Sequence, residues 1–433
     1  MTPVLPHPLT DAGGLGLLPY SIALGAVVLV AAAYAFVPAT PEEDDAAQRD
    51  GFADVDRPLG RARRITRAVS LVVVLLCVYA GRFGSADGLS NITPPLVVGV
   101  AWPALVVGSL LVRRLWRWVD PWDAAARALE PLASGSAPPA DEGDDAGNNN
   151  VEEADAGDIG GDAASPAVAP AVWGAVVSAA VVVYFLVARV DSTQPRTIGV
   201  ALAAYTIAAV ALGIGAGRRV LAGAEVFGLT SRWAGELRDG LGRRWSVPAG
   251  AEVVLGVVAG GLLLDLARRS GAYVDVLDAI GARRHATGNR ALIVALMVSC
   301  AAAAGVLALA ERAGARRGLA GGVAVAVLPV VLALLVVAKL RRLLVSVQLL
   351  PIVASDPLGR GWDLFGTAGG IVDPNPFGTP AQRWIAVAAV TVAGVAGAIA
   401  LRRRTGDRAA RDAASYALYL LVAVSALAVT TAV

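Results

Sequence analysis

The chain of 433 residues has few of the side chains from which metal and redox sites are usually built. It contains two histidines, two cysteines and two methionines. The histidines and cysteines are His7, His285, Cys77 and Cys300. A haem pair, a tetrahedral zinc site or a histidine-rich dinuclear site needs more imidazole or thiolate than this. Because both cysteines lie within apolar runs, we expect them to be small buried hydrophobic residues.

Charged residues are also scarce, at 17% of the chain, whereas 56% of residues are hydrophobic. Together with a mean hydropathy of +0.63, this excludes an ordinary soluble globular protein and indicates an integral membrane protein. A net charge of +2 gives no reason to expect a nucleic-acid partner. Lys339 is the single lysine among 37 basic residues, a bias typical of halophiles or high-GC organisms.

Ten predominantly apolar runs are long enough to cross a bilayer as helices. They cover about residues 18–37, 67–84, 94–112, 168–188, 197–216, 248–266, 290–311, 321–346, 384–401 and 414–433. None alternates polar and apolar residues with a period of two, so helices are favoured over barrel strands. We therefore predict an all-α polytopic transmembrane bundle of about ten spans, and residues 219–247 could add a shallow re-entrant segment.

Composition divides the chain into three parts. Residues 1–133 contain three predicted transmembrane helices and an interfacial helix. Residues 134–167 contain nine acids and no base, which predicts an acidic disordered linker. Residues 168–433 contain seven predicted transmembrane helices and a loop at 350–382, whose prolines and glycines predict an ordered path. No repeat is visible, so an inverted-repeat transporter is not indicated.

The distribution of basic residues predicts the orientation in the membrane. With the N-terminus outside, the connections on the cytoplasmic side carry 24 bases and those on the other side carry 13. Since cytoplasmic loops are enriched in Lys and Arg, we predict a multi-pass protein of the cell membrane with both termini outside.

A segment rich in tryptophan and arginine follows the third run. Asp120 can cap a helix that begins at Pro121, with Trp118 and Trp122 one turn apart. Tryptophan and arginine are common at the headgroup level of a membrane. We interpret the segment as an interfacial anchor, with a substrate or partner surface as the alternative.

The sixth run places a carboxylate beside a stripe of small residues. Glu252, Gly256 and Gly260 recur every four residues, which predicts a groove for close packing of another helix. Gly213 and Gly217 in the fifth run follow the same spacing. Glu252 is a candidate ion or proton site. Alternatively, it is a carboxylate near the cytoplasmic interface, solvated or paired with a nearby arginine at position 243 or 244.

Three cations interrupt the eighth run near its outer third, at Lys339, Arg341 and Arg342. Cations at that depth must face protein, water or headgroups. They could extend to lipid phosphates, or pair with Asp265 or with the loop that follows. Asp265 itself precedes two arginines by three and four residues, so a local ion pair at a helix end is equally consistent.

The loop at 350–382 contains a second set of polar candidates. Asp356, Arg360 and Asp363 could point inward from its sharply turned path. The alternative is a rigid cap that rests on the interface through Trp362 and Phe365.

The stretch from Ser355 to Thr367 resembles the most recognisable block of a polytopic membrane family of actinobacteria and haloarchaea, usually labelled fenitrothion hydrolase. Residues 91–95, which lead through Trp102 and Trp116 to 120–122, are similar to that family's Asn-x-x-Pro-Thr span and its Asn-Pro-Trp ending. Weaker similarities lie at Gly13-Gly14 with Pro19 and at Gly223-Ala224-Glu225-Val226-Phe227-Gly228. The chain departs from the family at Ala338-Lys339, where the family has a His-Tyr pair, and at Asp120, where Asn is usual.

The resemblance implies hydrolysis of an organophosphate triester or a similar lipophilic ester. Asp356 and Asp363 would then be metal ligands or general bases, and Arg360 would stabilise developing charge. A metal cofactor is implied only by this activity, because such hydrolysis normally uses metal-bound hydroxide.

The residues themselves favour a different first hypothesis. It is a non-enzymatic membrane protein, either permease-like or a subunit of a membrane assembly, whose outer polar cluster handles an anion or a partner. The candidate residues are Asp265, Lys339, Arg341, Arg342, Asp356, Arg360 and Asp363. The expected surroundings are the lipid bilayer and either further copies of the chain or a membrane-complex partner. A third hypothesis assigns every one of these charges a purely structural role.

Overall fold

The computed structural model describes residues 60–112, 115–134, 168–188, 194–238, 248, 250–280, 285–316, 319–404 and 408–432. Helices account for the regular structure of these residues, and no strand occurs among them, which confirms the predicted all-α class. The first predicted span at 18–37 and nearly all of the predicted linker lie outside the described residues.

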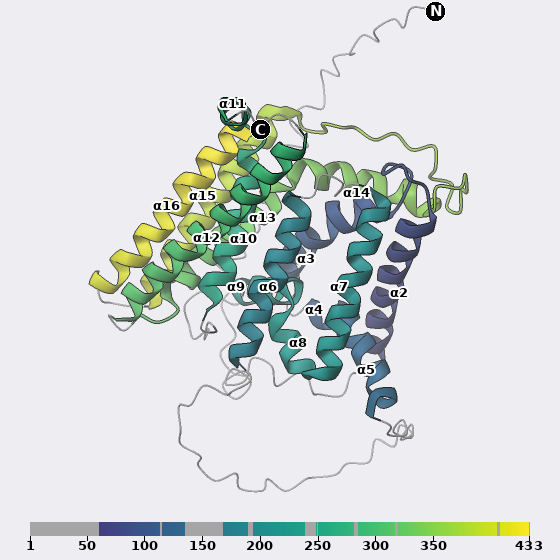
Figure 1. The fold of residues 1–433 in the computed structure, drawn as a ribbon, viewed down its shortest axis with the longest axis horizontal. Coiled ribbons are helices and arrows are strands. Elements are labelled where there is room, and N and C mark those ends of the chain that lie inside the picture. Colours follow the sequence, from purple (N-terminus) through teal and green to yellow (C-terminus); the bar gives the residue numbers. More distant parts are fainter. Residues whose placement is uncertain are drawn as a thin grey trace, which may run out of the picture.

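The other nine predicted runs all fall on helices, which stand side by side as a bundle (Figure 1). The long helices are α2 (Arg61–Phe83), η2 (Pro94–Ala101) continued by α3 (Trp102–Leu111), α6 (Val168–Val187), α7 (Pro195–Gly215), α10 (Ala251–Ala267), α12 (His285–Ala315), α13 (Gly322–Ala338) followed by α14 (Leu340–Ser355), α15 (Gly378–Arg404) and α16 (Arg408–Ala432). The short helices are α4 (Trp116–Val119), α5 (Pro121–Ser134), α8 (Arg218–Ala224), α9 (Val226–Arg238) and α11 (Gly271–Ala279).

Length and composition make five of the described helices candidates to cross a membrane, or six if α13 and α14 count as one bent span. The five are Arg61–Phe83, Pro94–Leu111, Pro195–Gly215, Arg290–Ala315 and Gly378–Leu401. Shorter apolar segments lie in α6 and α16, and α10 has 17 residues. The structure thus has apolar helices of the kind found in membrane proteins, and fewer candidates than the ten predicted.

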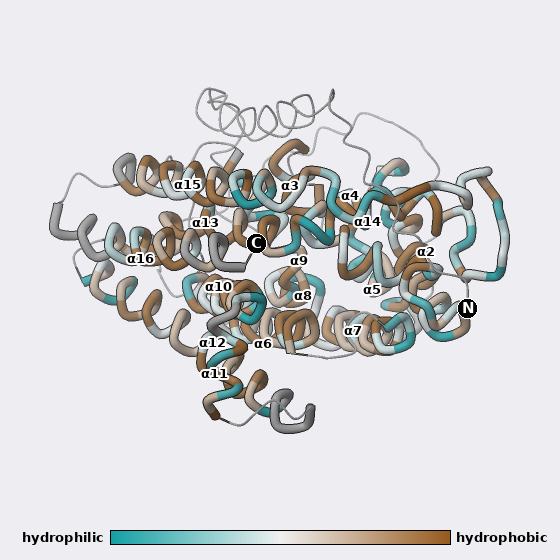
Figure 2. Tube along the Cα trace, turned by 90° about the horizontal axis from the view of Figure 1, so that it is seen from above, coloured by the Kyte–Doolittle hydropathy of each residue, from teal (hydrophilic) through white to brown (hydrophobic). Residues whose placement is uncertain are grey.

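Two helices, α10 and α13, form the centre of the bundle. Almost every residue of both is buried, as expected for helices that are apolar on all sides. They pack on each other and on α12, α15 and α16. The surrounding helices expose apolar side chains, such as Met297 on α12 and Val395 on α15, and Figure 2 shows hydrophobic residues along both. Such an outer surface suits contact with lipid tails.

The predicted small-residue groove is present on α10. A Cβ atom on Gly256 would lie 2.4 Å from Cα of Ala304, and one on Gly260 would lie 2.5 Å from the carbonyl oxygen of Ser299. The backbones of α10 and α12 therefore touch where a larger residue could not fit. On α7, Gly213 is also packed tightly, but Gly217 has φ +94° and begins α8. Gly217 is thus a turn residue and not part of a packing stripe.

The eighth predicted run is not a single span over 321–346. Its helix ends at Lys339, and α14 leaves at a bend of 56° to cross the end of the bundle (Figure 1). We call this the α14 end and the opposite one the α5 end. At the α14 end, α14 lies against η2, because Gly99 has no side chain where Ser346 approaches. Pro103 cannot donate the helical hydrogen bond to Gly99, which fits the wide π-helical turn of η2.

Residues 219–247 contain a helical pair that enters the bundle. Helix α8 ends at Glu225, where α9 begins and packs along α3. Trp102 donates a hydrogen bond to Thr230 at 3.0 Å, and the hydroxyl groups of Ser109 and Ser231 lie 2.5 Å apart. The segment is therefore more deeply embedded than the shallow one predicted.

The tryptophan-rich segment differs from the predicted anchor. Asp120 does cap α5, since its carboxylate accepts the backbone N–H groups of Trp122 at 3.1 Å and of the next residue at 3.0 Å. Trp116 and Trp122 are buried, however, and pack with Tyr205 and Phe227 inside the bundle. A break between α4 and α5 separates Trp118 from Trp122, which were predicted to lie one turn apart on one helix. Of Trp116, Trp118 and Trp122, only Trp118 is exposed.

Candidate functional site

Asp265 forms ion pairs with three basic side chains at the α14 end of the bundle. The carboxylate is fully buried in the last turn of α10. It accepts hydrogen bonds from Lys339 Nζ at 2.8 Å, from Arg268 at 2.7 and 2.9 Å, and from Arg269 at 2.5 Å. Arg269 also donates to the carbonyl oxygen of Ala338 at 3.0 Å. The local pair and the pair with Lys339 that were considered from the sequence are therefore both present.

The break between α13 and α14 places Lys339 beside this carboxylate. Its backbone closes α13 through a hydrogen bond to Val336, and its carbonyl oxygen opens α14 by accepting the N–H of Leu343 at 2.7 Å. The side chain of Lys339 is buried, where an unpaired charge would cost several kcal/mol. The ion pair with Asp265 thus fixes both the position of the ammonium group and the point at which the helix bends.

A cavity of 850 Å³ lies next to this ion-pair cluster. The five bases in its wall come from the two residues that follow α10 and from the start of α14: Arg268, Arg269, Lys339, Arg341 and Arg342. The remaining walls include the loop at 86–89, η2, Gln194 and Pro374. Among the described residues, Asp87 in the wall and Asp265 behind it are the acids that stand against these five bases, which leaves three positive charges in excess. We call this space the cationic cavity.

Two bases of the cationic cavity form no ion pair with a described carboxylate. Among the residues that the structure describes, no carboxylate forms an ion pair with Arg341 or Arg342. Both lie in the first turn of α14, which contains no acid and has no side-chain cap. The positive end of a helix dipole favours acids and disfavours bases there. The arrangement is therefore suited to an anion that approaches the start of α14.

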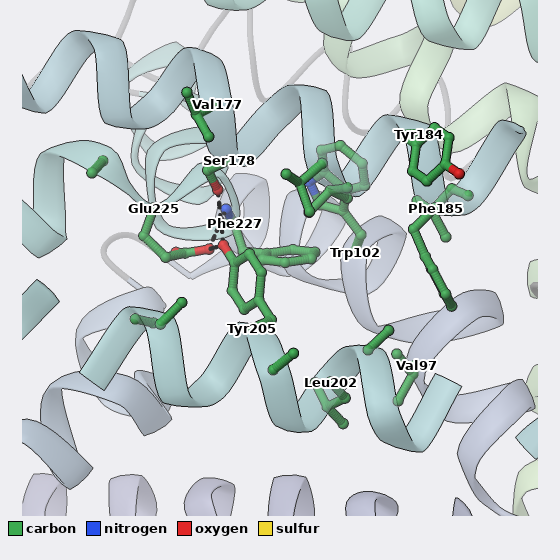
Figure 3. Close-up of a pocket in the computed structure, with 18 of the residues that line it drawn as sticks. Val97, Trp102, Val177, Ser178, Tyr184, Phe185, Leu202, Tyr205, Glu225 and Phe227 are labelled. Carbon is green, nitrogen blue, oxygen red and sulfur yellow. Dashed lines mark hydrogen bonds between the residues drawn. The ribbon is translucent and has the colours of Figure 1, made fainter. Parts of the chain in front are cut away.

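A second cavity, of 770 Å³, lies between α6 and α7 (Figure 3). Its lining is mainly aliphatic and aromatic and includes Val97, Trp102, Leu202 and Phe227. We call it the apolar cavity. Lys339 and Val98 line both the apolar cavity and the cationic cavity, so the two spaces are neighbours that share these two side chains as a wall at the break between α13 and α14.

One region of the apolar cavity is polar. Tyr205 donates to Glu225 at 2.8 Å, and the hydroxyl groups of Ser178 and Tyr205 lie 2.9 Å apart (Figure 3). Glu225 also accepts the backbone N–H of Phe227 at 2.8 Å, so it caps α9. The sequence reasoning assigned no site role to Ser178, Tyr205 or Glu225. The signal for Glu225 is a single acid between apolar residues where two short helices meet.

The loop residues Asp356, Arg360 and Asp363 do not line the cationic cavity. Asp356 accepts the backbone N–H groups of Arg360 at 2.9 Å and Gly361 at 2.6 Å. Asp363 accepts the hydroxyl of Ser355 at 2.7 Å and the N–H of the residue at position 368 at 3.0 Å. The carboxylates thus hold the turns of their own loop, which has the ordered path that was predicted.

These hydrogen bonds stabilise the charged form of both loop carboxylates. Partial burial raises the pKa of Asp356, but four backbone N–H groups lower it, and the net pKa lies below the usual 3.8. The pKa of Asp363 is also lowered, chiefly by the hydroxyl of Ser355. Arg360 lies over the ring of Trp362, with 5.8 Å between the guanidinium carbon and the ring centroid.

The two sequence blocks at 91–95 and 355–367 lie side by side in the structure. The N–H of Ser85 donates to the carbonyl of Leu358 at 2.7 Å, and that of Ile92 donates to Pro357 at 3.4 Å. The buried side chain of Asn91 donates to the carbonyl groups of Ala80 at 2.8 Å and Ser85 at 2.9 Å. The blocks therefore form one structural unit that closes the α14 end above α2 and η2.

Glu252 is remote from these residues. It lies in the first turn of α10, whereas Asp265 lies in the last, and it is partly exposed. Arg243 and Arg244, its predicted partners, lie outside the described residues, as does His7. No group of three or more His, Cys, Asp or Glu side chains suited to a metal ion occurs among the described residues.

The predicted site residues therefore fall into three places. Asp265, Lys339, Arg341 and Arg342 meet at the cationic cavity; Asp356, Arg360 and Asp363 order a neighbouring loop; and Glu252 lies at the other end of α10.

Comparison of the chain with protein-family models, with curated proteins and with solved structures gives no match.

Proposed function

We propose that this protein is a multi-pass protein of the cell membrane that binds an anion in the cationic cavity, as part of a permease-like function. The observation that carries the proposal is the excess of three positive charges among the described residues around a cavity in which neither Arg341 nor Arg342 forms an ion pair with a described carboxylate. Arginine binds carboxylate, phosphate and sulfate groups through paired N–H donors, so these are the expected anions.

The break at Lys339 supports a permease-like role. In many transporters, binding sites lie where a helix is interrupted, and the N-terminus of the second part faces an anionic group of the substrate. Here α13 ends at Ala338, and the start of α14 contributes Lys339, Arg341 and Arg342 to the cavity wall.

The proposed topology has ten spans and both termini outside. It counts as spans the nine predicted runs that fall on described helices and the run at 18–37. By length and composition alone, five or six spans of the described residues are candidates to cross a membrane. Support comes from the bias of 24 bases against 13 between the two sides. The cationic cavity then opens at the outer face.

Binding of inorganic phosphate to the purified full-length protein tests this proposal. In a neutral maltoside detergent, phosphate should raise the unfolding temperature of the wild type, because a ligand that binds only the folded state stabilises it. The double variant Arg341→Gln/Arg342→Gln should lose this rise. Arg82→Gln, which removes an exposed arginine at the same end of the bundle, is the matched control and should keep it.

The proposal fails if phosphate and sulfate shift the unfolding temperature of all three proteins equally. Equal shifts would mean that the anions act on the protein in general and not in the cationic cavity.

A further inference from the structure

We infer that the ligand is an anionic amphiphile, with its charged head in the cationic cavity and its hydrocarbon part in the apolar cavity. The inference rests on the proposed function and adds the substrate class. It follows from the shared wall, because Lys339 and Val98 belong to both cavities. A small inorganic anion would occupy the first cavity and leave the second without a role.

The apolar cavity has the size and lining of a ligand site. Its 770 Å³ lies within the range of about 300–1,000 Å³ that is usual for small-molecule pockets. Side chains of Val97, Trp102 and Leu202 surround it (Figure 3). A hydrocarbon chain is complementary to such a surface, because binding becomes more favourable with the apolar surface area that is removed from water.

The mouth of the apolar cavity opens on an apolar outer surface. On α6 the lining residues Trp173, Val177 and Val181 are 68%, 60% and 51% exposed. On α7 the lining residues Ala204 and Ala208 are also exposed. Both helices are apolar, and α7 is long enough to span a membrane. A chain could thus enter sideways between α6 and α7, directly from the lipid phase.

The charges at the junction fix the direction in which the amphiphile lies. Lys339 is held at the shared wall by Asp265, with Arg342 on the cationic side. Among the described residues that line the apolar cavity, no base other than Lys339 occurs, and Glu225 lies in its polar region. An anionic head is therefore favoured beside the arginines and disfavoured beside Glu225, which orients the chain away from the start of α14.

Dodecyl phosphate and inorganic phosphate, compared on the purified full-length protein, test the inference. In neutral maltoside micelles, the wild type should bind dodecyl phosphate at least tenfold more tightly than phosphate. Ala204→Trp, which narrows the mouth of the apolar cavity, should abolish this difference and leave phosphate binding unchanged. Ile207→Trp adds the same ring to an exposed position of α7 that does not line the cavity, so it should behave as the wild type.

The outcomes separate the two proposals. If wild type and Ala204→Trp bind dodecyl phosphate equally, or if the chain adds no affinity, the amphiphile is wrong and the anion site remains. If Arg341→Gln/Arg342→Gln binds both probes as the wild type does, the anion site itself is wrong. Both proposals are supported if Arg341→Gln/Arg342→Gln loses binding of both probes, if Ala204→Trp binds dodecyl phosphate no more tightly than phosphate, and if Ile207→Trp behaves as the wild type.

Discussion

At the scale of single residues, Asp265 connects the groups that form the wall of the cationic cavity. One buried carboxylate compensates Lys339, Arg268 and Arg269, and Lys339 is itself buried. Removal of one member of a buried ion pair leaves the other charge without compensation, which costs more than removal of both. The carboxylate therefore maintains the cavity wall by holding these three basic side chains in place.

Asp265→Asn should lower the free energy of unfolding by about 3–5 kcal/mol, the usual cost of a broken buried ion pair. Asp265→Asn/Lys339→Met should recover part of this loss, because it also removes the buried ammonium group. Denaturant titration of both variants in mixed micelles measures the effect. Equal stability of Asp265→Asn and the wild type would show that Lys339 does not need this partner.

The loop carboxylates predict a pH dependence of a different kind. Since the pKa values of Asp356 and Asp363 are lowered in the folded loop, their stabilising effect is complete above the ordinary value of 3.8 and is lost as the pH falls below it. Proteolysis within residues 356–368 should thus be slow at neutral pH, measured with a neutral protease, and still slow at about pH 4. In stronger acid it should be faster, measured with an acid-active protease whose rate is corrected with an unfolded substrate at each pH. Asp363→Asn should be cut faster at neutral pH. Unchanged cleavage of that variant would contradict this role.

Some of these residue roles could be predicted from the sequence. Three cations in an apolar run and a nearby acid indicate a pair, and Lys339 with Asp265 forms it. The groups that the loop carboxylates contact could not be predicted. Their partners include backbone N–H groups, and the type of a residue does not show which carboxylate its N–H binds. The partnership of Tyr205 with Glu225 joins separate helices, so local spacing does not reveal it.

At the scale of helices, close approach depends on a few glycines. The contact of α10 with α12 needs Gly256 and Gly260, and the contact of η2 with α14 needs Gly99, where a Cβ atom would lie 2.0 Å from the Ser346 hydroxyl. The first contact was predicted from a four-residue spacing within one apolar run. The second was not, because the three cations mark an interruption of the run but do not show that the helix bends there by 56° or which helix α14 then meets.

Gly256→Ala should destabilise the protein by about 1–3 kcal/mol, the usual cost of overpacking, because the added methyl group would meet the backbone of α12. Gly305→Ala is the matched control: nothing lies within 4 Å of its added methyl group, and alanine favours the helix. Thermal unfolding in detergent should therefore give opposite shifts for the two variants. A neutral result for Gly256→Ala would contradict direct contact of the two backbones.

At the scale of the whole molecule, the proposed topology puts α14 and the loop that follows it on the outer side and α5 on the inner side. Leu364 in the loop and Leu129 in α5 are both exposed. In a background with Cys77→Ala and Cys300→Ala, Leu364→Cys should react with a membrane-impermeant maleimide in intact cells. Leu129→Cys should react only after the membrane is opened. The reverse pattern would place the termini inside.

Protection of a cysteine in the cationic cavity is the measurement to make first. Val345 lines this cavity, whereas Leu364 lies on the neighbouring loop and does not. In the same background, without Cys77 and Cys300, we predict that dodecyl phosphate slows the reaction of Val345→Cys with an anionic, impermeant thiol reagent and leaves Leu364→Cys unaffected. If both cysteines react at the same rate with and without dodecyl phosphate, the anionic amphiphile does not occupy the cavity at Lys339.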